Sequence, residues 1–128
     1  MAVWRITWFL SSPTKTFGND EKKRYFISYF MHISHKQIFI TGHVQGVFFR
    51  DSTRQQATAL GLKGGVRNLS DGRVEVQVSG GEEAVQLLIK WLEIGPKYAK
   101  VSTIEVVDIP TGAISGEHNE RFEIWRTR

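Results

Sequence analysis

The stretch Ser70-Asp71-Gly72-Arg73-Val74-Glu75-Val76-Gln77-Val78 joins a turn signal to a strict alternation of polar and apolar residues. Alternation with a period of two predicts a strand that has one buried face and one solvated face. Residues 63–69, just before the turn, are also compatible with a strand. Because Asp-Gly between two such runs is a strong hairpin signal, we expect a hairpin here.

A helix is expected on each side of this hairpin. Residues 49–60 contain no Gly or Pro and stop at Gly61, and their apolar or small residues recur at Phe49, Thr53, Ala57 and Leu60. The second helix opens at Gly80-Gly81-Glu82-Glu83 and ends at Gly95-Pro96. It is amphipathic, with apolar residues at Val85, Leu88, Trp91 and Leu92.

Short strands are expected outside the two helices. They cover Gln37–Thr41, ended by Gly42, then Val101–Asp108, and finally Phe122–Trp125 after a region of uncertain form at 109–120. The element order is β-α-β-β-α-β, with that uncertain region before the final strand. It predicts an α+β fold, a ferredoxin-like sandwich in which an antiparallel sheet carries two helices on one face.

The composition fits one globular domain and excludes several classes of protein. The chain has 128 residues, of which 41% are hydrophobic and 23% charged. It has no cysteine, which rules out disulfides, thiolate metal sites, iron–sulfur clusters and cysteine nucleophiles. No apolar run approaches the ~18 residues that a membrane-spanning helix needs.

Residues 1–33 differ in kind from the rest of the chain. They carry five basic and two acidic residues and eight of the 15 aromatic residues, whereas residues 34–128 carry 12 basic and 11 acidic residues. They show no sustained periodicity. We therefore expect a poorly organised or non-native extension at 1–33 and a folded domain at 34–128. A secretory signal and a mitochondrial presequence are less favoured interpretations of this segment. A simpler hypothesis is that translation starts at Met31 and that residues 1–30 are upstream sequence read in frame.

The loop Gly42-His43-Val44-Gln45-Gly46-Val47-Phe48-Phe49-Arg50 joins the first strand to the first helix. Two glycines allow a sharp turn, and a helix amino terminus presents unpaired N–H groups to an anion. Arg50 at its edge would add a permanently charged, bidentate donor. The pattern favours a phosphate, sulfate or carboxylate site, although an ordinary surface arginine is an alternative. Neither the nucleotide P-loop nor the dinucleotide-binding motif is present.

The same loop resembles the phosphate-binding signature of the acylphosphatase family. The second half of that signature matches Gly64-Gly65-Val66-Arg67-Asn68, and the resemblance covers about residues 35–126. Three positions depart from the family pattern. His43 stands where a basic residue is frequent, Phe48 where a small residue is frequent, and Gly65 where Trp is usual. Phe48 affects the pocket wall, and Gly65 lacks a large packing group.

The resemblance implies an enzyme that hydrolyses the carboxyl–phosphate bond of acyl phosphates to a carboxylate and inorganic phosphate, with no metal or cofactor. Carried onto this chain, Asn68 positions the attacking water. Arg50 and the N–H groups of the loop hold the phosphoryl oxygens; the loop residues are His43, Val44, Gln45, Gly46, Val47, Phe48 and Phe49. The expected partner is a small acyl phosphate, with no membrane or nucleic acid, for a cytoplasmic monomer.

Other functions have weaker support in the sequence. A non-catalytic phosphate- or nucleic-acid-binding ferredoxin-like module is the alternative, but the central strands lack the pair of aromatic residues that sheet-based RNA binding uses. A degenerate acylphosphatase-like domain would have no need of both Arg50 and Asn68. Asp51 fits a charge at a helix amino terminus better than a base. The four histidines lack metal-ligand spacing.

Overall fold

The computed structural model describes residues 32–110 and 120–128, and within them five strands and two helices. The strands and helices in chain order are β1 (Ile33–His43), α3 (Phe49–Ala59), β2 (Lys63–Asn68), β3 (Val74–Gly81), α4 (Glu82–Leu92), β4 (Lys100–Asp108) and β5 (Phe122–Ile124). The expected extension lies outside the described residues except at its end, where Ile33 opens β1. Residues 111–119, most of the region of uncertain form, also lie outside them.

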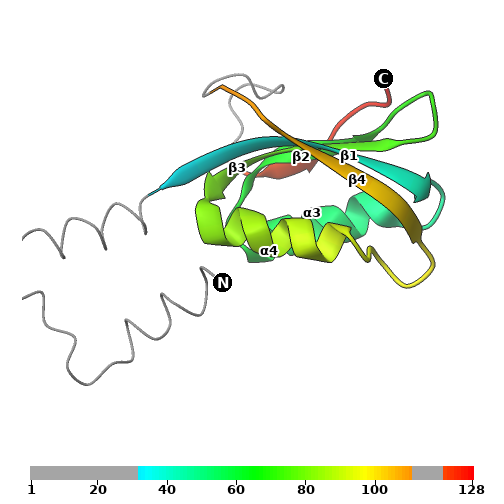
Figure 1. Cartoon of the computed structure of the whole chain (residues 1–128), viewed down its shortest axis with the longest axis horizontal. Coiled ribbons are helices and arrows are strands. Elements are labelled where there is room, and N and C mark those ends of the chain that lie inside the picture. Colours follow the sequence, from blue (N-terminus) through cyan, green and yellow to red (C-terminus); the bar gives the residue numbers. More distant parts are fainter. Residues whose placement is uncertain (1–31, 111–119) are drawn as a thin grey trace, which may run out of the picture. The chain divides into compact units, whose positions relative to one another are not determined.

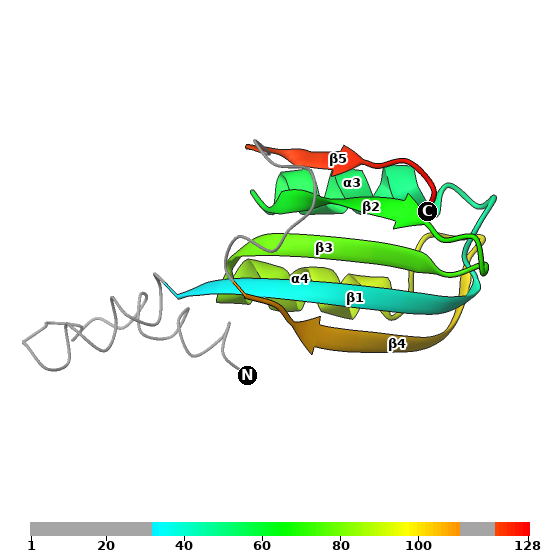
Figure 2. The same ribbon diagram turned by 90° about the horizontal axis from the view of Figure 1, so that it is seen from above.

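The strands form one sheet in the order β4-β1-β3-β2-β5 (Figure 2). The pairs β1–β3, β1–β4 and β2–β3 are antiparallel, and β2 and β3 are joined by the expected hairpin. In contrast to the expected antiparallel pattern, β5 runs parallel to β2. A tight turn forces neighbouring strands to be antiparallel, whereas the long connection from Asp108 to Phe122 leaves either direction open.

Both helices cover the same face of the sheet (Figure 1). α3 packs against β2 and β5, and α4 packs against β3 and β1. The ferredoxin-like α+β sandwich expected from the sequence is therefore confirmed. No helix within residues 32–110 and 120–128 is long and apolar enough to cross a membrane.

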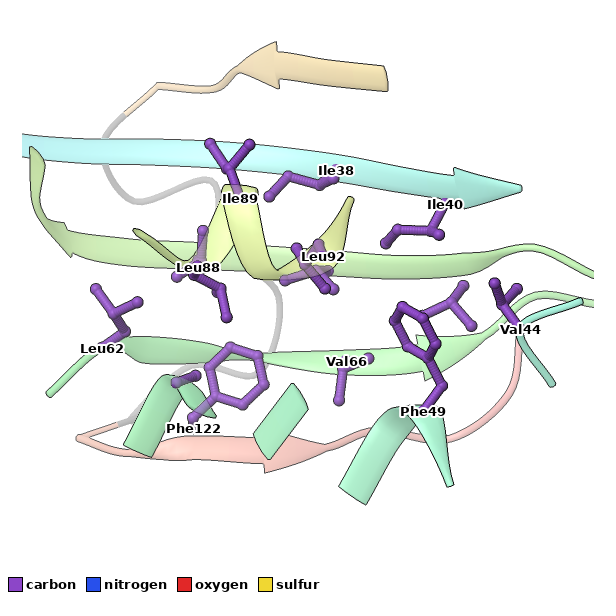
Figure 3. Packing of buried hydrophobic residues seen from close by; sticks show 14 of the residues in the cluster. Ile38, Ile40, Val44, Phe49, Leu62, Val66, Leu88, Ile89, Leu92 and Phe122 are labelled. Atoms are coloured by element: carbon purple, nitrogen blue, oxygen red, sulfur yellow. The ribbon is translucent and has the colours of Figure 1, made fainter. Parts of the chain in front are cut away.

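The core lies between the helices and the sheet (Figure 3). From α3 it receives Phe49, Thr53 and Ala57, as expected. On α4 the buried stripe is Val85, Leu88, Ile89 and Leu92. Trp91 is only half-buried at the side of this stripe, where its ring lies 6.0 Å from that of Phe49. Each fully buried aliphatic side chain contributes about 1.5–3 kcal/mol relative to exposure.

β1 does not end at Gly42, contrary to the sequence prediction. It continues to His43, and its pairing with β4 shifts by one residue between Thr41 and Gly42. Gly42 has a φ of 136°, and a Cβ on it would lie 2.2 Å from the carbonyl oxygen of Lys100. The bulge thus requires glycine, and it sets the direction in which the chain leaves β1.

Trp125, just after β5, occupies the space above Gly65 in β2. A Cβ on Gly65 would lie 2.1 Å from the indole ring, and the backbone N–H of Trp125 donates to the carbonyl oxygen of Val66 over 2.8 Å. The guanidinium carbon of Arg67 lies 5.5 Å from the centre of the same ring. The bulk that Gly65 lacks is therefore supplied by a side chain from another part of the chain.

Candidate active site

The loop between β1 and α3 presents an array of backbone N–H groups. In the described part of the chain, none of the N–H groups of residues 44–48 donates to a backbone oxygen outside the regular elements. The next three N–H groups belong to the first turn of α3, which has no acceptor of its own for them. Gly46 has a φ of 75° and Phe48, at the helix N-cap, a φ of 60°. These two left-handed residues curl the loop around the amino terminus of α3.

A cavity of about 350 Å³ lies beside this loop. Its walls come from the loop, the first turn of α3, the end of β2 and β5. They are formed by Val44, Gly46, Phe48, Phe49, Arg50, Asp51, Asn68 and Ile124. Figure 3 shows Val44 and Phe49 near the end of β2. Arg50 and Asn68, 18 positions apart in the sequence, thus share one cavity.

Asn68 reaches the cavity because of the alternation of β2. Val66 is fully buried on the helix-covered face, and Asn68, two residues later, shares that face, while Arg67 points to the other. The backbone carbonyl of Asn68 accepts a hydrogen bond from the N–H of Arg128 over 3.1 Å. Its side-chain Oδ1 is buried and has no partner within the described residues. A buried acceptor of this kind calls for a partner, such as water or a ligand.

The two charged residues at the start of α3 differ in their surroundings. Asp51 accepts hydrogen bonds from Arg54 over 2.7 Å and from Gln55 over 3.0 Å. For Arg50, which is half-buried, no ion pair or side-chain hydrogen bond occurs within the described residues. The guanidinium of Arg50 therefore remains available to an anion in the cavity, whereas the carboxylate of Asp51, which also lines the cavity, is already bonded to Arg54 and Gln55.

Gln45 has a structural role that the sequence did not reveal. Its Nε2 donates to the carbonyl oxygens of Leu69 over 2.8 Å and of Arg73 over 2.9 Å. Leu69 directly follows β2 and Arg73 directly precedes β3, so both belong to the turn of the β2–β3 hairpin. The side chain of Gln45 thereby fastens the loop beside the strand end that carries Asn68.

Two further residues of the loop, His43 and Val47, do not line the cavity. His43 is the exposed last residue of β1, opposite Lys100. Val47 is 7% exposed and belongs to the core. Conversely, Ile124 lines the cavity but was not expected there, because its position depends on the parallel pairing of β5 with β2. No local sequence pattern could have placed it.

The arrangement can bind and orient an anion. N–H groups without a backbone acceptor, the positive end of the α3 dipole and a free guanidinium all favour a phosphate-sized anion. No group of three or more His, Asp or Glu side chains in the described ranges is placed to hold a metal ion. These features define a ferredoxin-like sandwich in which the first strand-to-helix loop, an arginine and an asparagine line one cavity.

Comparison with known proteins identifies the family. The model of the family described as Acylphosphatase matches residues 36–124. An acylphosphatase of Pseudomonas paraeruginosa is 54% identical over 78 residues, which are 61% of this chain and 86% of the relative. The chain belongs to the acylphosphatase family. The resemblance read from the two motifs is thus confirmed, and with it the class of hydrolases acting on acyl phosphates.

Solved structures agree with this assignment. An acylphosphatase from Coxiella burnetii superimposes with a TM-score of 0.65 at 34% identity, covering 73% of this chain and 93% of that one. An acylphosphatase from Bacillus subtilis gives the same TM-score and identity and is covered over 99% of its length. The fold therefore corresponds to that of the whole of these smaller proteins.

Proposed function

We propose that the cavity beside Arg50 and Asn68 is the active site of an acylphosphatase and that this site works without metal or cofactor. A water oxygen forms a bond to phosphorus while the bond from phosphorus to the acyl oxygen breaks. The products are a carboxylate and inorganic phosphate. The observation that carries the proposal is that Arg50, whose guanidinium is free, and Asn68, whose Oδ1 is buried and unpartnered in the described structure, line one cavity with residues of the loop.

Arg50 and the N–H groups of residues 43–49 bind the phosphoryl oxygens. Phosphoryl transfer demands in-line positioning and stabilisation of charge on these oxygens more than covalent help from the protein. The guanidinium supplies two parallel donors, and the N–H groups are fixed in place before the substrate arrives. These contacts therefore both raise the affinity for the phosphoryl group and lower the activation barrier of its transfer to water.

Asn68 orients the attacking water. Its Oδ1, lacking a partner in the described structure, accepts one hydrogen of the water and directs the oxygen lone pair toward phosphorus. The proton released in the attack goes to an oxygen of the substrate's own phosphoryl group. Because the leaving group is a carboxylate, a stable anion, it needs no protonation, and the site requires no general acid.

Two substitutions test these roles in assays with benzoyl phosphate in the presence of EDTA. Loss of one preorganised transition-state contact costs ~10² to 10³ in rate. We expect Asn68→Ala to lower kcat by this order while inhibition by inorganic phosphate stays nearly unchanged. Arg50→Ala should lower kcat and raise KM together. Unchanged turnover in either variant would remove the role assigned to that residue, and wild-type inactivity in EDTA would contradict the metal-free mechanism.

The alternative, a nucleic-acid-binding module, finds less support on the open face of the sheet. There Arg73 covers the ring of Phe39 at 4.8 Å and Arg67 covers that of Trp125, so both rings are already engaged within the chain. We therefore propose a small acyl phosphate as the partner of the domain formed by residues 34–128. We further propose a cytoplasmic monomer, which light scattering of the purified protein would test for its oligomeric state.

A further inference from the structure

Phe48, at the edge of the cavity, combines two unfavourable properties. Its side chain is 78% exposed, and its φ of 60° is in the left-handed region. The other described residues with positive φ are all glycines, namely Gly42, Gly46, Gly61, Gly64, Gly72 and Gly95. A bulky residue in this conformation is an outlier. As the N-cap of α3 it also makes no side-chain capping bond. Folding stability alone therefore gives no reason for a phenylalanine here.

Ile124 faces the same cavity from a different element. It lies on β5, next to Val66 of β2, and it is 42% exposed although its side chain is large and apolar. Phe48 comes from the loop and Ile124 from the sheet, so two exposed apolar side chains from different elements line one cavity. Among the cavity-lining residues that the structure describes, these two are the exposed large hydrophobics.

The cavity is thus chemically divided. Arg50, Asp51, Asn68 and the loop backbone provide its polar part, and Phe48 and Ile124 provide an exposed apolar part. An acyl phosphate is divided in the same way, since its phosphoryl group is anionic and its acyl substituent carries no charge when it is a hydrocarbon. When the phosphoryl group lies against the loop, the acyl substituent remains in the same cavity, which Phe48 and Ile124 also line.

We infer that Phe48 and Ile124 form a subsite for the acyl substituent and that the chain favours acyl phosphates with an aryl or branched apolar group over acetyl phosphate. This inference rests on the proposed function. The phosphoryl group is common to all such substrates, so contacts with it cannot discriminate among them. Apolar contacts at Phe48 and Ile124 grow with the area of the substituent, and selectivity is therefore decided there.

The measurement is the ratio of kcat/KM for benzoyl phosphate to kcat/KM for acetyl phosphate. We expect Phe48→Ala to lower this ratio about tenfold and Ile124→Ala to lower it by a smaller factor. Phe48→Gly removes the ring and also the cost of the left-handed backbone. An equal fall in the ratio in the Ala and Gly variants would assign the effect to the ring. Tyr98→Ala is the control, because Tyr98 is an aromatic residue of similar exposure, 67%, that does not line the cavity.

The ratio separates the subsite from other roles of Phe48. If the Phe48 variants lose activity equally on both substrates, the ring orders the loop and does not contact the acyl group, and the inference is wrong. An unchanged ratio in the Phe48 and Ile124 variants overturns it as well. Failure of the proposed function has a different signature, because the wild-type protein would then hydrolyse neither substrate.

Discussion

At the scale of single residues, the signature loop contains side chains with different tasks. Arg50 and Asn68 line the cavity, whereas Gln45 is turned away from it and holds the β2–β3 hairpin through two hydrogen bonds. Gln45 therefore connects the β1–α3 loop to the end of β2, which carries Asn68. The chemistry depends on Gln45 only through the placement of the loop relative to Asn68.

Gln45→Ala should weaken both the fold and the site. Two hydrogen bonds are lost, but Leu69 and Arg73 keep backbone donors for their carbonyl groups, so we expect a loss of about 1 kcal/mol in the free energy of unfolding. The loop would also lose its fixed position, which should raise the KM for benzoyl phosphate. Urea unfolding and steady-state kinetics measure the two effects.

Gln55→Ala is the matched control for this substitution. Gln55 is an exposed residue on α3 whose side chain bonds only to Asp51 among the described hydrogen bonds. Its replacement should change stability by no more than about 0.5 kcal/mol. If the two variants had the same KM, the positioning role of Gln45 would be refuted.

At the scale of the elements, local patterns were sufficient where the pairing partner is close in sequence. The Ser70–Val78 stretch predicted the hairpin, and the apolar stripes predicted both helices. The bulge at Gly42 was missed because it depends on β4, nearly sixty residues later. Ile124 was missed for the same reason, since its place in the cavity follows from a parallel pairing with β2. Motif resemblance located Arg50 and Asn68, which local pattern alone could not have brought together.

Gly42→Ala should be one of the most damaging small substitutions in the domain. The new Cβ would meet the backbone of Lys100 and Ser102, at 2.2 and 2.8 Å, and the φ of 136° is unfavourable for alanine. We expect a loss of about 2–4 kcal/mol, measured by thermal or urea unfolding.

Gly61→Ala is the control that separates the cost of the left-handed backbone from the cost of the steric clash at Gly42. Gly61 also has a positive φ, 70°, but a Cβ there meets nothing within 4 Å. Left-handed alanine alone costs about 1 kcal/mol. A loss at Gly42 no larger than that at Gly61 would show that the sheet can move to accept the Cβ, and that glycine is not required by the bulge.

At the scale of the whole molecule, the open face of the sheet is held together around a buried carboxylate. Glu75 is 3% exposed and accepts hydrogen bonds from Gln37 over 2.5 Å, Arg67 over 2.6 Å and Gln77 over 3.1 Å. Burial by itself raises the pKa of Glu75. The hydrogen bonds from Gln37, Arg67 and Gln77 and the charge of Arg67 outweigh burial and hold the pKa below its ordinary value of 4.5.

The lowered pKa makes the stability of the domain sensitive to acid. The folded state binds this proton less readily than the unfolded chain does, so the stabilisation is complete above pH 4.5 and is lost as the pH falls through the lowered pKa. Glu75→Gln should remove this part of the pH dependence. At neutral pH it should also cost about 3 kcal/mol, because Arg67, whose side chain is 11% exposed, loses its partner.

Urea unfolding between pH 3 and pH 7 measures this effect of Glu75. Asp71→Asn serves as the comparison, since its pair with Arg73 is exposed to solvent and should contribute little. If Glu75→Gln and the wild type lost stability in parallel below pH 4.5, the acid sensitivity would have to arise from other carboxylates.

Because the indole of Trp125 packs directly on Gly65, the residue types that fit at these two positions, sixty residues apart in the sequence, depend on each other. An indole at both positions would claim the same volume, and glycine at both would leave a hole beside Arg67. Replacing Gly65 by Trp alone, or Trp125 by Gly alone, should therefore lower the stability of the domain. The first replacement is tolerated only together with loss of the indole at position 125. This dependence couples the two positions, and it ties the short β5 segment to β2 through side-chain packing as well as through backbone pairing.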